Sequence, residues 1–378
     1  MSCAQQPADN TKDVHAVNTE SAVPSDEADP ATVRIVLVGC GAIGWEVATR
    51  VYAHPTGGRY RLVAAVDPHA DRADAVGALL GIPAFASLAE VLAAGVEFDA
   101  VDQRLPHHLH ADAAVEVLTA GRHVLVEKPL ATSVADATRM VAASEGGGVV
   151  AAVAENYPHL SAVKAARHAI AAGQAGAIRA LRTTRAYTLG GVWVRDGWRA
   201  GTGPSSGIML DQGTHHTSLL RQLGGEITAV AAQHSTAPED AGDGEVETVL
   251  LTVRFASGLI GHSVYSWGAA ALVDEAEATV FGSKARIDVR VSYEADLGHA
   301  HCFDAHAQTP QGTAISPPEN YYGSHRLMVD DWVAAIIEQR QPLVTFADAA
   351  ADLAVVFAAA TSLQHGGDFV EVAQIVKG

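Results

Sequence analysis

The segment around residue 40 restricts the fold of this chain more than any other. Residues 33–38 form a β-branched run that predicts a buried strand, and the turn Gly39-Cys40-Gly41-Ala42-Ile43-Gly44 follows directly, ahead of a helical pattern. In such a turn the first glycine permits the sharp bend, the second lets a pyrophosphate approach the backbone, and the third lets the helix pack on the strand. We therefore expect Gly39, Gly41, Ala42, Ile43 and Gly44 to bind a dinucleotide at a helix N-terminus.

The next predicted strand indicates which dinucleotide binds. Residues 61–66 form a mostly apolar run that ends at Asp67. A carboxylate at this position can accept hydrogen bonds from the adenosine ribose hydroxyls and would repel a 2′-phosphate. Asp67 therefore predicts NAD in preference to NADP, although Arg72 lies close enough along the chain to weaken that preference.

Strand and helix patterns alternate as far as residue 153. Helical patterns at 70–80, 87–94, 110–120 and 133–145 separate short apolar runs, which is typical of a doubly wound parallel sheet. We therefore expect an α/β fold whose first domain, residues 32–153, is a Rossmann domain. Residues 1–31 are rich in Asp, Glu, Ser and Pro and poor in large apolar groups, so they predict a disordered tail.

A different pattern follows in residues 154–378. After a helix at 160–172, segments that alternate in polarity predict a large, mostly antiparallel open sheet with one solvated or oligomer-facing side; they are residues 178–186, 227–233, 247–255, 259–267, 276–282 and 285–291. We expect residues 296–320 to be irregular and the helices 324–340 and 347–365 to close this α+β domain.

Composition excludes several classes of partner. The net charge of −18 argues against nucleic acid and against anionic membranes, because both require clustered cations. It favours a neutral or cationic small substrate. No apolar run reaches the roughly 20 residues of a membrane span. The three cysteines fit no disulfide framework or zinc knuckle, so a reducing cytoplasm is the expected compartment.

A lysine stands where open α/β sheets bind their ligands. Lys128 follows an apolar run that predicts a buried parallel strand, and Pro129 follows it. The carboxyl ends of such strands form the ligand-binding edge. Lys128, one of only five lysines, is therefore expected to meet substrate and cofactor, with a solvated loop lysine as the alternative.

The order of the motifs resembles the Gfo/Idh/MocA family of sugar and cyclitol dehydrogenases, over residues 33–375. The motifs are Gly39-x-Gly41-x-x-Gly44, Asp67, Pro106 with His110, Ala120 to Val124, Glu127-Lys128-Pro129, Trp198-Arg199 and Gly207 to His215. The resemblance implies that Lys128 lies near the nicotinamide and the reacting hydroxyl, and that Asp211 and His215 complete the catalytic group. It also implies cofactor contacts from Pro106, His110 and Glu127.

The chemistry of these side chains agrees with those roles. Asp211 and His215 are four residues apart and would share one face of a helical turn. A histidine is a natural general base for a hydroxyl proton, and the Lys128 ammonium can stabilise a developing alkoxide. Asp211 would orient the imidazole or grip a substrate hydroxyl. The alternative is a helix cap beside a core histidine.

Further residues are candidates for substrate contacts. Asn156 and Tyr157 open the second domain, Trp198 and Arg199 lie in a glycine-rich loop that could close over a sugar, and His216 could support the site; packing is the alternative for each. Asp102-Gln103-Arg104 interrupts a strand that is usually apolar in the family. No metal is expected, although His107, His108 and His110, or His299, His301 and His306 with Cys302, are a conceivable zinc group.

These features predict an NAD-dependent dehydrogenase that oxidises a secondary hydroxyl of a sugar, cyclitol or aminosugar-type substrate to a ketone, or the reverse. The many Ala, Val and Gly residues and few lysines suggest a high-GC genome and an aminoglycoside or other secondary-metabolite pathway. We expect a homodimer or homotetramer. The alternatives are an enzyme that uses the hydride step transiently, such as an NAD-dependent glycosidase or epimerase, and a non-catalytic dinucleotide sensor.

Overall fold

The computed structural model describes residues 32–55, 57–146, 148–187, 207–236, 247–267, 276–293, 298–304 and 312–377. From residue 31 onward the chain packs as one unit. The predicted tail, Trp198, Arg199 and His306 lie outside the described residues, and their roles stay predictions.

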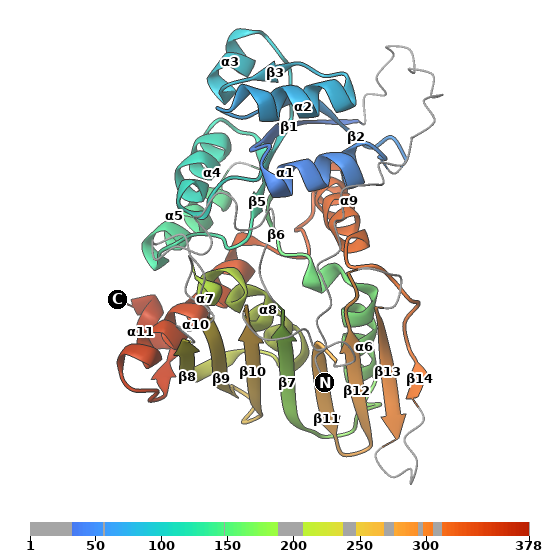
Figure 1. The fold of residues 1–378 in the computed structure, drawn as a ribbon, viewed down its shortest axis with the longest axis vertical. Coiled ribbons are helices and arrows are strands. Elements are labelled where there is room, and N and C mark those ends of the chain that lie inside the picture. The colour runs from blue at the N-terminus through green and yellow to red at the C-terminus, as the bar shows by residue number, and fades with distance from the viewer. Residues whose placement is uncertain are drawn as a thin grey trace, which may run out of the picture. The chain divides into compact units, whose positions relative to one another are not determined.

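The first layer is a six-stranded parallel sheet in the order β3-β2-β1-β4-β5-β6 (Figure 1). Its strands are β1 (Val33–Val38), β2 (Tyr60–Val66), β3 (Ala84–Phe85), β4 (Ala100–Gln103), β5 (His123–Glu127) and β6 (Ala151–Ala154). The connecting helices are α1 (Ala42–Val47), its π-helical extension η1 (Ala48–Tyr52), α2 (Ala70–Leu80), α3 (Leu88–Ala93), η2 (His107–Leu109), α4 (His110–Thr119) and α5 (Val134–Ser144). The doubly wound parallel sheet is confirmed, because apolar strands with helices on both faces have no polar side to expose.

The second layer is a nine-stranded sheet in the order β14-β13-β12-β11-β7-β10-β9-β8-β15. Its strands are β7 (Ile178–Ala186), β8 (Ile227–Thr236), β9 (Glu247–Phe255), β10 (Ile260–Ser266), β11 (Ala278–Gly282), β12 (Ala285–Arg290), β13 (His299–Asp304), β14 (Gly312–Ala314) and β15 (Val370–Glu371). The remaining helices are η3 (Tyr157–His159), α6 (Ser161–Ala171), α7 (Ile208–Asp211), α8 (Gly213–Gly224), α9 (Gly323–Glu338), α10 (Phe346–Gln364) and α11 (Val372–Lys377). All its described pairings are antiparallel except β7 with β10, so the second, mostly antiparallel sheet is confirmed.

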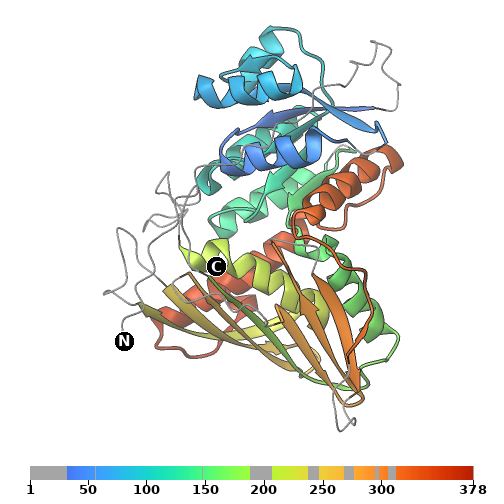
Figure 2. The same cartoon turned by 45° about the vertical axis from the view of Figure 1, so that its right-hand side comes forward.

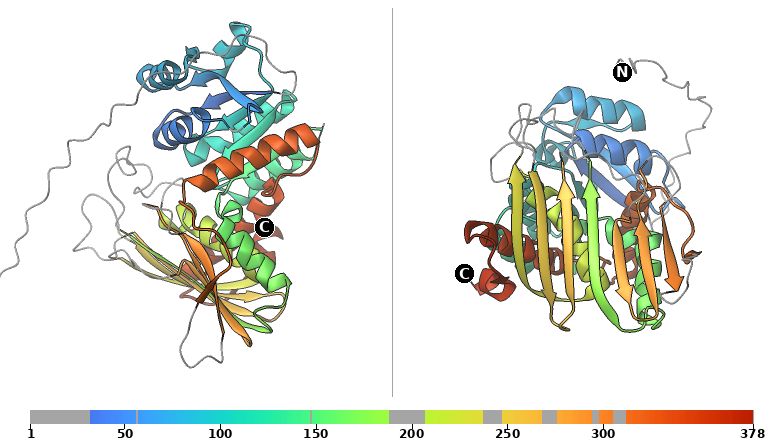
Figure 3. Two further views of the ribbon diagram at one scale, coloured as in Figure 1. Left: turned by 90° about the vertical axis from the view of Figure 1, so that its right-hand side faces the viewer. Right: turned by 60° about the horizontal axis from the view of Figure 1, so that its bottom comes forward.

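One face of this sheet is covered and the other is open. Helices α6, α8 and α10 lie on the inner face, whereas the described helices leave the outer face bare (Figures 2 and 3). Leu250, Ile260 and Phe281 are exposed large apolar residues on strands β9, β10 and β11. Alternation along the strands therefore matches a half-buried sheet, as its polarity pattern predicted.

The prediction that residues 296–320 are irregular is wrong for two parts of that segment. His299–Asp304 forms β13, which pairs with β12, and Gly312–Ala314 forms the edge strand β14. Ala300 is fully buried under α6, but the rest of β13 consists of two His, Cys302, Phe303 and Asp304. Such a strand lacks the β-branched residues that reveal strands in a sequence, and only its pairing with β12 fixes it.

The last long helices connect the two layers. Met328, Val329 and Trp332 of α9 pack in one core with strands of the parallel sheet. Phe346 and Leu353 of α10 join a core on its other face, while Ala358 and other residues further along α10 join the core of the antiparallel sheet. Packing thus returns α9 to the first domain, although the linear boundary predicted at 153/154 places it in the second. Among the described residues α10 alone is long and apolar enough to span a membrane, and its burial is that of a core helix.

Candidate active site

The carboxyl edge of the parallel sheet gathers the predicted functional residues. The glycine turn follows β1, Asp67 follows β2, Glu127 ends β5 and Lys128 follows it, and Glu155 follows β6. Parallel strands with right-handed crossovers place all these chain positions at one edge. Helices α7 and α8, which carry Asp211 and His215, meet that edge from the other layer.

The glycine turn is shaped to admit a ligand. Gly39 has a φ of +95°, and a Cβ there would collide with the carbonyl of Arg104. A Cβ at Gly44 would collide with the carbonyl of Gly39, but at Gly41 the nearest atom would be Nη1 of Arg72, 4.0 Å away. The first and third glycines are therefore required by the protein itself, whereas the second leaves open space where a pyrophosphate can approach. These residues fit NAD.

Asp67 stabilises this turn by accepting backbone hydrogen bonds. Its Oδ2 accepts a hydrogen bond from the Cys40 backbone N–H at 2.8 Å, and its Oδ1 accepts one from that of His69 at 2.9 Å. Asp67 is buried, with 5% of its surface exposed. Each oxygen retains a second lone pair, so the carboxylate can still accept a ribose hydroxyl.

Asp102 and Arg104 belong to a buried ionic cluster inside the first domain, which we call the strand network: Tyr52, Asp102, Arg104 and Glu127. Arg104 donates to Asp102 Oδ1 at 2.6 Å and to Glu127 Oε2 at 2.6 Å, and the Tyr52 hydroxyl donates to Asp102 Oδ2 at 2.7 Å. Burial alone would lower the pKa of Arg104, but the two carboxylates raise it, so the guanidinium stays charged. The polar interruption of β4 is thus an internal ion pair that holds Glu127 beside Lys128.

The ring of His110 lies between two backbone carbonyls. Its ring is fully buried, with Nδ1 2.8 Å from the Pro129 carbonyl and Nε2 2.9 Å from the Leu105 carbonyl. Burial lowers its pKa, so the neutral ring donates to one of the two carbonyls. His110 therefore supports the bend after Lys128, and its predicted contact with the cofactor stays a prediction. Pro106 lies in the same loop, half-buried before η2.

Lys128 and Asp211 form the first of two pairs that link the domains. Lys128 Nζ lies 2.6 Å from Asp211 Oδ1 and also donates to the Asp211 carbonyl at 3.0 Å. Gln212 donates to the other carboxylate oxygen at 3.3 Å. The nearest ring nitrogen of His107 is 3.9 Å from Asp211 Oδ1. The carboxylate of Asp211 is thus paired with the ammonium group of Lys128.

His215 and Glu155 form the second pair. His215 Nδ1 lies 2.8 Å from Glu155 Oε1, and the Tyr157 ring lies beside the imidazole at a centroid distance of 4.9 Å. Asp211 ends α7 and His215 lies in α8, so the two residues do not share one unbroken helix. The role of orienting the imidazole, predicted as one option for Asp211, is filled in this geometry by Glu155. We call Lys128–Asp211 and His215–Glu155 the cross-domain pairs.

Comparison with known proteins agrees with this arrangement. Residues 33–155 match a family described as "Oxidoreductase family, NAD-binding Rossmann fold", and residues 163–288 match the GFO/IDH/MocA C-terminal domain. The chain belongs to the Gfo/Idh/MocA oxidoreductase family. Its NAD-binding domain is therefore the parallel-sheet layer, and the resemblance inferred from the motifs is confirmed.

Individual relatives act on sugars and cyclitols. The chain is 31% identical to 1,5-anhydro-D-fructose reductase of Ensifer adhaerens over 60% of this chain and 67% of that protein. It is 28% identical to inositol 2-dehydrogenase 4 of Saccharopolyspora erythraea over 60% of this chain and 65% of that one. A solved levoglucosan dehydrogenase with NADH and levoglucosan shares the fold, with a TM-score of 0.77 and 23% identity over 90% of this chain and 99% of that chain.

Among the predicted substrate residues of this family member, the described ones are buried. Asn156 donates to Ser324 at 2.7 Å, and Tyr157 donates to Glu277 at 2.5 Å. His216 stacks on Tyr265 with a centroid distance of 4.9 Å, and burial lowers its pKa well below the usual value. These contacts favour the packing alternative, in which the three residues support the site.

Two charged residues near Tyr157, which are Glu277 and Arg185, were not found from the sequence. Glu277 also pairs with Arg185 at 3.1 Å, and the Arg185 guanidinium lies over the Tyr293 ring at 4.2 Å from its centroid. Burial opposes the charge of Arg185, but Glu277 and the nearby tyrosines raise its pKa well above the usual value. Glu277 directly precedes β11 and Arg185 is the second-last residue of β7, and no motif surrounds either of them. Glu155 was also missed, although its position directly after β6 is a signal that could have found it.

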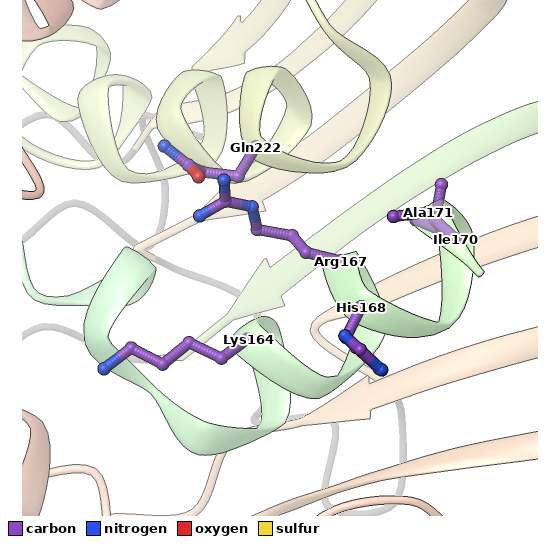
Figure 4. A pocket seen from close by; sticks show the side chains of 6 residues that line it. All are labelled: Lys164, Arg167, His168, Ile170, Ala171 and Gln222. Carbon is purple, nitrogen blue, oxygen red and sulfur yellow. The ribbon is translucent and has the colours of Figure 1, made fainter.

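A separate hollow of about 380 Å³ lies between α6 and α8. Lys164, Arg167 and His168 project from α6 beside it, and Gln222 comes from α8 (Figure 4). None of the predicted site residues lines this hollow. In the described part of the chain no three His, Cys, Asp or Glu side chains are grouped as a metal site would require.

Proposed function

We propose that this protein is an NAD-dependent dehydrogenase that oxidises a secondary hydroxyl of a sugar, cyclitol or aminosugar-type substrate to a ketone, or catalyses the reverse reduction. The observation that carries the proposal is that Lys128, which follows β5 at the NAD-binding edge, and His215, on α8, both interact with Glu155 at the same edge. Each is held by its own carboxylate, Asp211 for Lys128 and Glu155 for His215.

The two side chains would have separate roles, one in proton transfer and the other in stabilising the developing negative charge. His215 takes the hydroxyl proton as general base, and the Lys128 ammonium donates a hydrogen bond to the oxygen as negative charge develops on it. NAD, when bound, accepts the hydride from the carbinol carbon. In the reverse direction the same imidazole returns the proton, so the residues serve both directions.

Residues of the first domain would hold the cofactor. The open backbone at Gly41, with Ala42 and Ile43 at the start of α1, would receive the pyrophosphate, and Asp67 would accept the adenosine ribose hydroxyls. Glu127 is held beside Lys128 by Arg104, within reach of the same edge. Exclusion of a 2′-phosphate by Asp67 supports NAD over NADP.

Among the described residues, the charges around the site favour an uncharged or cationic substrate. Two cations, Lys128 and Arg185, are each paired with a carboxylate, and Glu155 adds a third carboxylate beside His215. No surplus cation among them is available for a phosphate or a carboxylate. The names of the relatives, a 1,5-anhydro-D-fructose reductase and an inositol 2-dehydrogenase, support a cyclic polyhydroxy compound. An aminosugar is the cationic case, and an aminoglycoside pathway is one setting for it.

The cellular context is part of the same proposal. A homodimer or homotetramer would cover the open face of the nine-stranded sheet, and a cytoplasmic location would supply NAD.

A substrate panel tests the function. Cyclitols, hexoses, nucleotide-sugars, aminoglycosides and sugar acids would be incubated with NAD and with NADP, following the absorbance of the reduced cofactor. We expect NADH to accumulate with a neutral or amino-substituted cyclic polyol. Turnover of substrate without net NADH would favour the transient-oxidation alternative, and a preference for phosphorylated or carboxylated sugars would contradict the charge argument.

A further inference from the structure

The imidazole of His215 is fixed by groups that come from outside its own helix. Glu155, directly after β6, places Oε1 2.8 Å from Nδ1, and the Tyr157 ring covers one side of the imidazole. Glu155 is itself held, because the Tyr157 backbone N–H donates to Oε1 at 3.1 Å. Only 3% of Glu155 and 6% of His215 is exposed. The ring therefore has little freedom to rotate or to exchange partners.

The carboxylate of Asp211, four residues before His215, contacts groups other than the imidazole. Its Oδ1 contacts Lys128 and its Oδ2 accepts from Gln212. Gln212 also separates the end of α7 from the start of α8, which carries His215. The spacing of four residues therefore does not produce the Asp–His pair that it suggests.

A carboxylate can only accept hydrogen bonds, so the nitrogen that faces it must carry the hydrogen. With Nδ1 protonated, the neutral imidazole has its lone pair on Nε2, on the opposite side of the ring. We propose that Glu155 is the positioning residue that fixes the hydrogen of His215 on Nδ1 and leaves Nε2 as the proton acceptor. The acceptor role rests on the proposed function. In the reaction the hydroxyl proton moves to Nε2, and Glu155 keeps its charge and stabilises the imidazolium that forms.

The surroundings of Glu155 keep it ionised. Burial raises the pKa of Glu155, but the charge and hydrogen bond of His215, the Tyr157 N–H and Lys128 together lower it below the usual value. The other titratable groups near the pair are Tyr157 on η3, His216 on α8 and His325 on α9, which face His215, and Lys128 after β5, which interacts with Glu155. Glu155 alone among these pairs with a ring nitrogen of His215 in the described part of the chain.

One consequence concerns the two domains. Glu155 extends from the parallel sheet, whereas His215 belongs to a helix that covers the antiparallel sheet. The base is therefore oriented only when the two layers are in the relative position seen here. In the same way Asp211 reaches from the second layer to orient Lys128 of the first.

Nuclear magnetic resonance tests the tautomer without any substrate. Long-range ¹H–¹⁵N spectra of the full ¹⁵N-labelled chain report which ring nitrogen carries hydrogen, and loss of signals in His215→Asn identifies His215. We expect the Nδ1–H tautomer in the wild type and a mixture in Glu155→Gln, because an amide can donate as well as accept. Asp211→Asn is the matched control and should leave the tautomer unchanged. An unchanged tautomer in Glu155→Gln would overturn the proposal.

Kinetics add a readout that a merely structural role would not move. Glu155→Gln should lower kcat by about tenfold to a thousandfold, with less effect on KM. The pH profile of kcat should also change, because Glu155→Gln removes a negative charge beside the base. Glu155→Asp keeps the charge and should recover part of both effects. It also serves if Glu155→Gln proves unstable in a thermal melt.

The outcomes separate this proposal from the function itself. A fixed tautomer that is lost in Glu155→Gln, with no turnover of any panel substrate, would refute the proposed function and leave the positioning role intact. Turnover with the same pH profile in the wild type and Glu155→Gln would refute the positioning role and leave the function intact.

Discussion

The strand network and the cross-domain pairs are both buried ionic clusters, but they connect different parts of the molecule. Tyr52, Asp102, Arg104 and Glu127 all belong to the first domain, and Arg104 is 7% exposed. The cross-domain pairs join the parallel sheet to α7 and α8 of the second layer. A cluster within one domain can stabilise only that domain, whereas pairs across the domains also depend on the relative position of two layers.

The largest expected effect is on catalysis, through the cross-domain pairs. Lys128→Ala or His215→Ala should lower turnover by about two to four powers of ten, the range for a lost charge stabiliser or general base. The double variant should be far from additive because the two groups act on one proton. NADH affinity, measured by fluorescence titration, should change little. A folded Lys128→Ala protein with wild-type turnover would contradict the assignment and favour a sensor.

The next largest expected effect is on the free energy of unfolding, through the strand network. Arg104→Met leaves two buried carboxylates without their cation, so the free energy of unfolding should fall by about 3–5 kcal/mol. Arg34 makes comparable contacts with Asp99 and Glu97 at the surface, and Arg34→Met should cost about 1 kcal/mol or less. Urea denaturation measures both. Equal losses in the two variants would show that burial does not distinguish these ion pairs, and a loss of turnover in Arg104→Met as large as in Lys128→Ala would make the network catalytic.

A smaller effect concerns Asp67, which follows β2 at the cofactor-binding edge. Asp67→Ala should narrow the preference for NAD over NADP by about tenfold to a hundredfold, because it removes charged hydrogen bonds to the ribose and the repulsion of a 2′-phosphate. Competitive titration with both cofactors gives the ratio. A wild-type preference for NADP would refute the role given to Asp67.

A further effect on stability appears in acid, at the junction of the two layers. Burial lowers the pKa of His159 on η3 to about 4. Below about pH 6.5 this histidine is protonated in the unfolded chain but not in the folded chain. The free energy of unfolding should therefore fall as the pH drops from 6.5 to 4, by about 1.4 kcal/mol per pH unit for this histidine. His159→Gln should remove that part of the slope. His365→Gln, at an exposed position, is the control, and identical slopes in the two variants would contradict the prediction.

The sequence by itself determined the first domain in detail. The glycine turn, Asp67 and the alternation of apolar runs with helical patterns rest on short-range rules, so β1, α2 and the doubly wound parallel sheet could be predicted. Lys128 was placed at the ligand-binding edge for the same reason, because the carboxyl end of a parallel strand is defined by its local pattern.

Only the tertiary structure decided which charges meet. In the sequence, Asp102 and Arg104 interrupt an apolar strand without a visible reason. Their contacts with Tyr52 and Glu127 in the folded structure explain them. The spacing of Asp211 and His215 suggested one pair, whereas folding gave each a partner from the parallel-sheet edge. Glu155 lies 60 residues from His215 along the chain. Pairing of charges depends on distance in space, and local patterns carry no information about partners that far apart in the sequence.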